Sequence, residues 1–331
     1  MIIIGLFPKK MKSFYKKLFY IMKRIRFVEE KIALKYPEGK MRCPTHLSIG
    51  QELMGGLVGL FLKKNDYAVS THRAHAHYLG KGGDLKSLIA ELYGKETGCS
   101  LGHGGSMHLI DDKVSFMGST AIVGSNIPIG VGLSLSIKLD RKNNISCIFL
   151  GDGAVEEGVF YESLNFSAVK KTPALFICEN NNYSVYSPME VRQPQNRTIH
   201  EMVKYIGLQV FFVDSKNIEM SVKIFQEAVD FVRKNKQPAF FEMSTYRWRE
   251  HCGPNFDDHL NYRPNGELLD WQASDPLKKI EEEIIKSKYF TKSKLKEIEL
   301  NLKNEIDEAF EFAEKSNFPS ENKLFLNEYA T

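Results

Sequence analysis

Residues 145–183, ISCIFLGDGAVEEGVFYESLNFSAVKKTPALFICENNNY, contain the pattern that decides the fold. Two apolar runs, 145–150 and 174–178, flank a segment in which Phe160 and Leu164 lie four residues apart. Such runs are typical of strands buried on both faces, and the four-residue spacing is typical of a helix. A strand–helix–strand unit places two parallel strands side by side through a right-handed crossover. The stretch therefore predicts an α/β fold, a parallel sheet with helices on both faces.

Polar residues follow both predicted strands. Asp152 stands in a Gly-Asp-Gly turn after the first strand, and Asn181 follows the second. Ligands bind at the carboxyl ends of strands in open parallel sheets. Carboxylate and amide oxygens suit Mg²⁺ or Ca²⁺. These two residues are therefore expected to face one ligand.

The start of the connecting helix is expected to bind an anion. We expect the helix to begin near Ala154, so that its amide groups point at the same crevice. A carboxylate beside a phosphate is repulsive unless a cation lies between them. The unit therefore predicts a metal-bridged phosphate or diphosphate. Taken alone, Gly-Asp-Gly could instead be a tight turn in which Asp152 caps the following helix. The paired asparagines after the second strand favour the metal site over this alternative.

Composition narrows the class of protein. The 331 residues carry 45 basic and 41 acidic side chains. The sequence has no dense basic patch with interleaved aromatic residues, the pattern that would predict nucleic-acid binding. No apolar run approaches the ~20 residues of a membrane span. The five cysteines show no CxxC or zinc-like spacing, which fits reduced thiols in a cytoplasmic protein.

Two predicted helical extensions enclose the central unit. Apolar residues spaced four and three apart from Phe14 to Ile32 predict an amphipathic helix. We expect it to pack on the chain's own core, and a helix facing a partner or a membrane surface is the alternative. A second apolar stripe runs from Leu295 to Ala313. We expect strand–helix alternation to continue at 203–213 and 218–232. The predicted organisation is an N-terminal helical extension at 1–36, an α/β domain at 37–274 and a C-terminal helical extension at 275–331.

Three histidines at 72, 75 and 77 would suggest zinc. We reject that interpretation because His75 and His77 share no helix face, and Arg73 would put a cation inside the ligand set. Arg73 is better used as a bidentate partner of a diphosphate. His103 and His108 lie in a glycine-rich loop that either turns tightly or lets its backbone approach a ligand. The sequence assigns these two no chemistry.

Taken together, these motifs resemble the α subunit of the thiamine diphosphate-dependent 2-oxo acid dehydrogenases that act on pyruvate and branched-chain acids, and of the related acetoin dehydrogenases. The resemblance extends from about Arg24 to about Ala313 and implies the thiamine diphosphate-binding fold. Gly-Asp-Gly and Asn-Asn form the cofactor motif, and Asn181 lies 29 positions after Asp152. The other matching segments are HLSIGQE, THRAHAHYLGKG, GHGGSMH, IVGSNIPIGVG and TYRWREH.

The resemblance implies a set of site residues. The metal ligands, for Mg²⁺, would be the Asp152 and Asn181 side chains and the Tyr183 carbonyl. His46 and His251 would serve catalysis near the substrate. The residues that would contact thiamine diphosphate are His72, Arg73, Ile122, Val123, Asp152, Gly153, Ala154, Asn181 and His251.

The resemblance also implies a partner. In the family, a glutamate that activates the pyrimidine ring belongs to a separate β subunit, and no segment here resembles that second domain. We therefore expect an α₂β₂ heterotetramer acting on a small 2-oxo acid, with a lipoyl acyltransferase as a further partner.

Three functions stay open at this point. The first is oxidative decarboxylation of a 2-oxo acid, or acetoin cleavage, with acyl transfer to a lipoyl domain. The second is a decarboxylating carboligase of sugar or ketone metabolism, since Cys43-Pro44-Thr45 departs from the family's aromatic-rich pattern. The third is a non-catalytic subunit that keeps the cofactor pocket for assembly.

Overall fold

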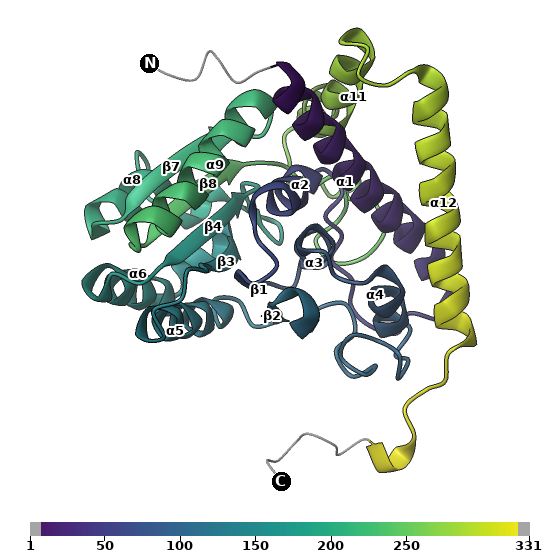
Figure 1. The fold of residues 1–331 in the computed structure, drawn as a ribbon, viewed down its shortest axis with the longest axis horizontal. Helices are drawn as coiled ribbons and strands as arrows, with labels where there is room; N and C mark the ends of the chain where they lie inside the picture. Colours follow the sequence, from purple (N-terminus) through teal and green to yellow (C-terminus); the bar gives the residue numbers. More distant parts are fainter. Residues whose placement is uncertain (1–7, 324–331) are drawn as a thin grey trace.

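A six-stranded parallel sheet forms the centre of the protein, with strand order β2-β1-β3-β4-β8-β7. The structure is a computed structural model that describes residues 8–323. The strands are β1 (Tyr67–Ser70), β2 (Phe116–Ser119), β3 (Ser146–Gly151), β4 (Ala174–Asn180), β7 (Gln209–Asp214) and β8 (Ala239–Ser244). A short antiparallel ladder joins β5 (Tyr183–Ser184) to β6 (Ser187–Pro188). The predicted α/β fold is confirmed (Figure 1).

Alternate residues of the central strands enter two separate cores. In β3, Cys147 and Phe149 face one core, and Ile148 and Leu150 face the other. All four are buried, which explains why this strand is apolar throughout. Helices therefore cover both faces of the sheet, as predicted.

The helices divide between these faces (Figure 1). The smaller core contains residues of α5 (Asn126–Leu139), α6 (Gly158–Lys170) and α8 (Ile199–Ile206). The larger core contains residues of the helices α1 (Pro8–Lys35), α2 (Glu52–Phe61), α3 (His75–Lys81), α4 (Leu85–Leu92), α9 (Ile218–Asn235), α11 (Pro276–Lys286) and α12 (Lys292–Lys315). Two short helices, α7 (Met189–Arg192) and α10 (Glu267–Ala273), lie in the connections.

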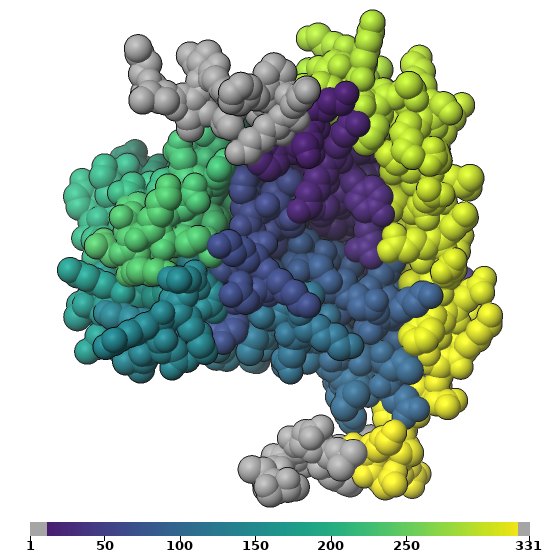
Figure 2. All heavy atoms as spheres, viewed as in Figure 1, coloured from purple at the N-terminus to yellow at the C-terminus, as the bar shows by residue number. Residues whose placement is uncertain are grey.

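Both terminal helices pack on the protein's own core, as the apolar spacing predicts. Leu18, Ile25 and Ile32 of α1 are buried, and so are Leu302 and Ala313 of α12. Figure 2 shows the C-terminal helices, in yellow, lying against the N-terminal half of the chain. The division at 36 and 274 stays a prediction, and its outermost residues, 1–7 and 324–331, lie outside the described part.

Two predicted boundaries are wrong. The helix after β3 does not begin near Ala154, because Asp152–Glu156 forms a 3₁₀ turn and Glu157 is extended, so α6 begins at Gly158. The predicted strand at 203–213 is the end of α8 followed by β7, since Ile199 and Val203 bury one face of a helix.

Within the described residues, no helix is both long enough and apolar enough to cross a membrane.

Candidate active site

A cavity of about 120 Å³ lies where β3 and β4 end. Loops far apart in the sequence line it, and the predicted site residues among them are His72, Arg73, Val123, Asp152, Gly153, Ala154, Asn181, Tyr183 and His251. His46 and Ile122 do not line this cavity. The carboxyl ends of neighbouring parallel strands thus bring most of the predicted residues together.

Asp152 and Asn181 lie side by side, as the strand–helix–strand pattern predicts. The Asn181 backbone N–H donates to Asp152 Oδ1 at 3.3 Å. Asn181 Oδ1 accepts a hydrogen bond from the Tyr183 N–H at 3.1 Å, which closes a tight turn after β4. The three residues predicted to bind the metal therefore lie together in the lining of the cavity.

The carboxylate of Asp152 is buried and already has a cation beside it. Its exposed fraction is 1%, and burial raises its pKa despite the favourable charge of Arg192. Arg192 donates to Asp152 Oδ2 and also to Glu156 and the carbonyl of Asn182. A buried carboxylate needs such compensation, so this position fits a cation, whether guanidinium or metal.

The turn that follows Asp152 is shaped for close backbone approach. A Cβ at Gly153 would lie 2.6 Å from the hydroxyl of Ser184, so a larger residue there would require Ser184 to move. The amides of Gly153 and Ala154 belong to the 3₁₀ turn rather than to the first turn of α6. The anion-binding amides predicted for a helix end would come from this turn.

Arg73 is buried, and no carboxylate among residues 8–323 forms an ion pair with it. Its guanidinium donates to the carbonyls of Leu47 at 2.6 Å and His251 at 3.0 Å. Burial, with a smaller contribution from the charge of Arg247, lowers its pKa to about 9, so it stays protonated at neutral pH. A cation without a hydrogen-bonded carboxylate on the cavity wall suits an anionic ligand, and a guanidinium suits a diphosphate in particular.

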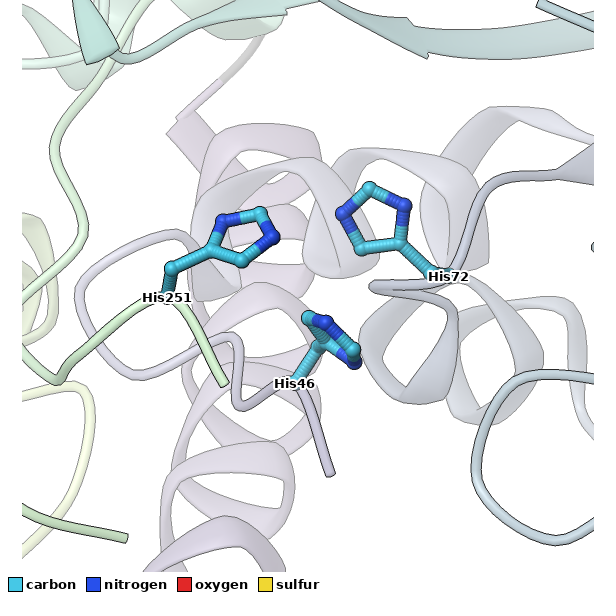
Figure 3. A group of neighbouring side chains, drawn as sticks. All are labelled: His46, His72 and His251. Carbon is cyan, nitrogen blue, oxygen red and sulfur yellow. The ribbon is translucent and has the colours of Figure 1, made fainter. Parts of the chain in front are cut away.

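Three histidines from separate loops converge beside Arg73. Figure 3 shows the rings of His46, His72 and His251 turned toward one another. Their ring centroids are 4.5 to 5.3 Å apart, and one nitrogen of each lies within 4.8 Å of the others. His46, although outside the cavity lining, is therefore adjacent to both histidines that line it.

All three imidazoles are neutral at neutral pH. Burial, together with the positive charge of Arg73, lowers the pKa of His46 to about 2, of His72 to about 4 and of His251 to about 3. Such nitrogens could ligate a metal, but the adjacent Arg73 disfavours a second cation. Nδ1 of His46 is buried and has no hydrogen-bond partner in the described part of the protein, so the cluster keeps a free polar atom for a ligand.

The other histidines of the His-rich segment do not belong to this cluster. His75 bonds Glu29 and Ser106, and His77 bonds Ser70 and Glu179. The geometry agrees with the rejection of a zinc site formed by residues 72, 75 and 77.

The glycine-rich loop encloses a carboxylate of the chain itself. Backbone N–H groups of Ser100, Gly102, Gly104 and Gly105 donate to buried Glu91. His103 and His108 are exposed on that loop.

Elsewhere, Ile122 is 68% exposed. Only a contact through its backbone, or with a partner, would fit the predicted cofactor role.

Several residues at the site have no role in the sequence-based prediction, and three of them make or border its polar contacts. Gln51 and Glu179 line the cavity, and Arg192 bonds Asp152. Gln51 belongs to the segment HLSIGQE, five residues after His46, and Glu179 lies two residues before Asn181. Arg192 lies in a polar stretch without periodicity, where the sequence offers no signal.

Comparison with known proteins gives a consistent result. The family model described as dehydrogenase E1 component matches residues 20–322. The chain is 37% identical to a protein of Rickettsia bellii over 97% of both chains, and 38% identical to one of Rickettsia felis over 97% of this chain and 98% of that one. It is 32% identical to a protein of Porphyra purpurea over 90% of this chain and 88% of that one. All three relatives carry the name pyruvate dehydrogenase E1 component subunit alpha.

Proposed function

The chain belongs to the dehydrogenase E1 component family as the α subunit of a thiamine diphosphate-dependent 2-oxo acid dehydrogenase, and from that premise we propose that it acts on pyruvate and provides the metal- and diphosphate-binding half of the active site. The names of its relatives support pyruvate as the substrate. The observation that carries the proposal is the pairing of Asp152 and Asn181 at adjacent strand ends.

We propose specific holders for the cofactor. Asp152, Asn181 and the Tyr183 carbonyl would hold Mg²⁺, which suits oxygen ligands. The fit rests on Asp152, whose buried carboxylate is already compensated by a cation of this chain. Arg73 and the amides of the 3₁₀ turn would hold the diphosphate.

The cofactor, when bound, supplies the electron sink for decarboxylation. Our proposal gives the histidines a different part. With a pKa of about 2, His46 is a poor proton carrier at pH 7, and the same holds for His251, whose pKa is about 3. Each would act as a neutral hydrogen-bonding group that orients the 2-oxo acid, and a bound anion would raise both pKa values.

The site also has to be completed from outside. Ligand pockets are typically about 300–1,000 Å³, whereas this cavity is about 120 Å³. A β subunit belongs to this type of enzyme, and we propose that it covers the cavity in an α₂β₂ assembly. A lipoyl acyltransferase is the proposed acceptor of the acyl group.

The decisive experiment uses the α chain co-expressed with its β partner. Decarboxylation is measured with a panel of 2-oxo acids and an artificial electron acceptor, and then with a lipoyl domain as acceptor. Pyruvate should give the highest kcat/KM, and the α chain alone should give no turnover. Preference for an aldehyde acceptor would favour the carboligase instead. Full activity of Asp152→Ala in the complex would favour the assembly subunit.

A further inference from the structure

A continuous chain of buried hydrogen bonds leads from β1 to the proposed metal ligand Asn181. The Ser70 hydroxyl contacts His77 Nδ1 at 2.8 Å, and His77 Nε2 contacts Glu179 Oε2 at 2.6 Å. The Gln51 amide nitrogen donates to Glu179 Oε1 at 3.4 Å, and the Asn181 amide nitrogen donates to Gln51 Oε1 at 3.3 Å. The side chains of the four residues behind Asn181 are buried.

The carboxylate of Glu179 sets the direction of every hydrogen bond in this series. A carboxylate accepts hydrogen bonds and donates none, so Glu179 requires a donor from both neighbours. His77 must then carry its proton on Nε2, which leaves Nδ1 to accept from Ser70. Gln51 must turn its NH₂ group toward Glu179 and its oxygen toward Asn181.

The consequence reaches the metal position. Since Gln51 presents an oxygen, Asn181 must present its NH₂ group to Gln51, and its own oxygen then faces the opposite way. That oxygen accepts one bond from the Tyr183 N–H and keeps a second acceptor site. A rotated amide would present NH₂ where a metal requires oxygen.

We infer that Glu179 is a positioning residue which, through Gln51, fixes the Asn181 amide with its oxygen toward the metal. The inference rests on the proposed function, in which Asn181 is a ligand. Partners behind metal ligands typically change metal affinity 10–100-fold when they are mutated.

The neighbouring strand provides a matched control. Glu242 of β8 is as buried as Glu179 is, with 2% and 8% exposure. It accepts from the Asn180 amide at 2.8 Å and contacts His200 at 3.0 Å. Its amide partner is the first asparagine, which the proposal does not assign to the metal.

The test is a double-mutant cycle on the α/β complex with saturating thiamine diphosphate. Mn²⁺ replaces Mg²⁺ as the probe, and the free ion is counted by electron paramagnetic resonance. Glu179→Gln should raise the Kd for Mn²⁺ roughly 10–100-fold. In Asn181→Asp the ligand can no longer donate to Gln51, so either orientation of the Gln51 amide sets two acceptors against each other. Adding Glu179→Gln removes this conflict, because the introduced glutamine can donate to Gln51 while it still accepts from His77, and Gln51 can then turn its NH₂ group toward the introduced aspartate.

The double variant should therefore bind Mn²⁺ at least about tenfold more tightly than the product of the two single effects predicts, because mutations in one hydrogen-bond network couple. Glu242→Gln combined with Asn181→Asp should be multiplicative within about twofold. Multiplicative behaviour of the Glu179 pair, or equal coupling of the Glu242 pair, would overturn the inference.

Two further variants keep the result interpretable. If Glu179→Gln yields no folded complex, Gln51→Met provides a second test. It removes the hydrogen bonds from Gln51 to Glu179 and to Asn181, and it should weaken Mn²⁺ binding at least about tenfold. An unchanged Kd there would also overturn the inference. Asp152→Ala tests the proposed metal site separately. If this variant still binds Mn²⁺ normally, the metal site is wrongly assigned. If Asp152→Ala alone loses Mn²⁺ binding and the Glu179 and Gln51 variants keep it, only the positioning role of Glu179 is wrong.

Discussion

The guanidinium of Arg192 donates to the carboxylate of Asp152, a residue 40 positions earlier in the chain. Both side chains are buried, with 8% and 2% of their surfaces exposed. The chain therefore supplies its own cation at the carboxylate that the proposal assigns to a metal. Two cations cannot share this carboxylate at low cost, so metal binding and the Arg192 contact should compete.

Arg192→Ala should strengthen binding of the metal and cofactor while it weakens the protein without them. Removing one partner of a buried ion pair costs about 3 kcal/mol or more, because Asp152 is left uncompensated. The same change removes a competitor, so the Kd for Mg²⁺ with thiamine diphosphate should fall roughly tenfold, which is about 1.4 kcal/mol. Calorimetric titration and thermal unfolding with and without ligand measure the two effects.

Arg197→Ala is the control for this prediction. Arg197 lies on the same segment but bonds Gln193 and Tyr161, and it makes no contact with Asp152. Both the Kd and the stability should stay close to wild type. Weaker cofactor binding by Arg192→Ala would instead mean that Arg192 itself holds the diphosphate.

Arg73→Lys should show how much of the cofactor binding depends on the planar guanidinium of Arg73 and how much on its charge alone. The guanidinium bonds the carbonyls of Leu47 and His251 at once, which ties together the loops that carry two of the clustered histidines. Lysine keeps the charge but lacks the planar fork for a diphosphate. We expect the Kd for the cofactor to rise roughly 10–100-fold, or about 1.4–2.7 kcal/mol, in equilibrium dialysis. An unchanged Kd would show that charge alone suffices.

The histidine cluster should make the cofactor-free protein sensitive to acid. The pKa values of His46, His72 and His251 lie at about 2, 4 and 3 in the folded state, against about 6.5 in an unfolded chain. Between pH 6.5 and about 4 the unfolded state binds more protons, so stability falls as pH falls. From pH 7 to 5.5 each histidine should cost about 1 kcal/mol.

Denaturant unfolding at the two pH values measures this loss. Combining His72→Gln with His251→Gln removes two of the three groups, so the loss should shrink by about 2 kcal/mol. Comparing variant with wild type cancels the other titrating groups. An equal loss in both proteins would show that the histidines are not buried as neutral groups.

The strands at the site could be predicted from sequence because their signals are local. The apolar runs before Asp152 and Asn181 identify β3 and β4 directly, and parallel pairing then brings the two residues together. The convergence of the three histidines depended on family resemblance, since their loops share no pattern. The start of α6 was misplaced because a 3₁₀ turn precedes it, and such turns are common at the N-termini of α-helices.

Other features of the site depend on contacts that no local pattern encodes. Arg192 reaches Asp152 from a polar stretch that resembles any surface loop. The glycine-rich loop is a similar case. Its glycines indicate an unusual backbone, but not that the group they surround is Glu91, located ahead of the loop on α4.

That loop supports a last prediction. Glu91 accepts hydrogen bonds from four backbone N–H groups between Ser100 and Gly105, and it is completely buried. Glu91→Gln keeps the size of the side chain but replaces one acceptor oxygen with an NH₂ donor. Two backbone donors would then face a donor, which should cost about 3 kcal/mol or more.

The loss should be confined to one segment of the chain. Hydrogen exchange at residues 98–106 should accelerate strongly in Glu91→Gln, while β3 and β4 keep their protection, because the loop would open locally. Glu96→Gln is the control, since that carboxylate pairs with Lys323 at the surface and such pairs contribute little. Acceleration spread evenly over the whole chain would mean that Glu91 stabilises the global fold. Unchanged exchange in the loop would mean that its backbone is held by contacts other than this carboxylate.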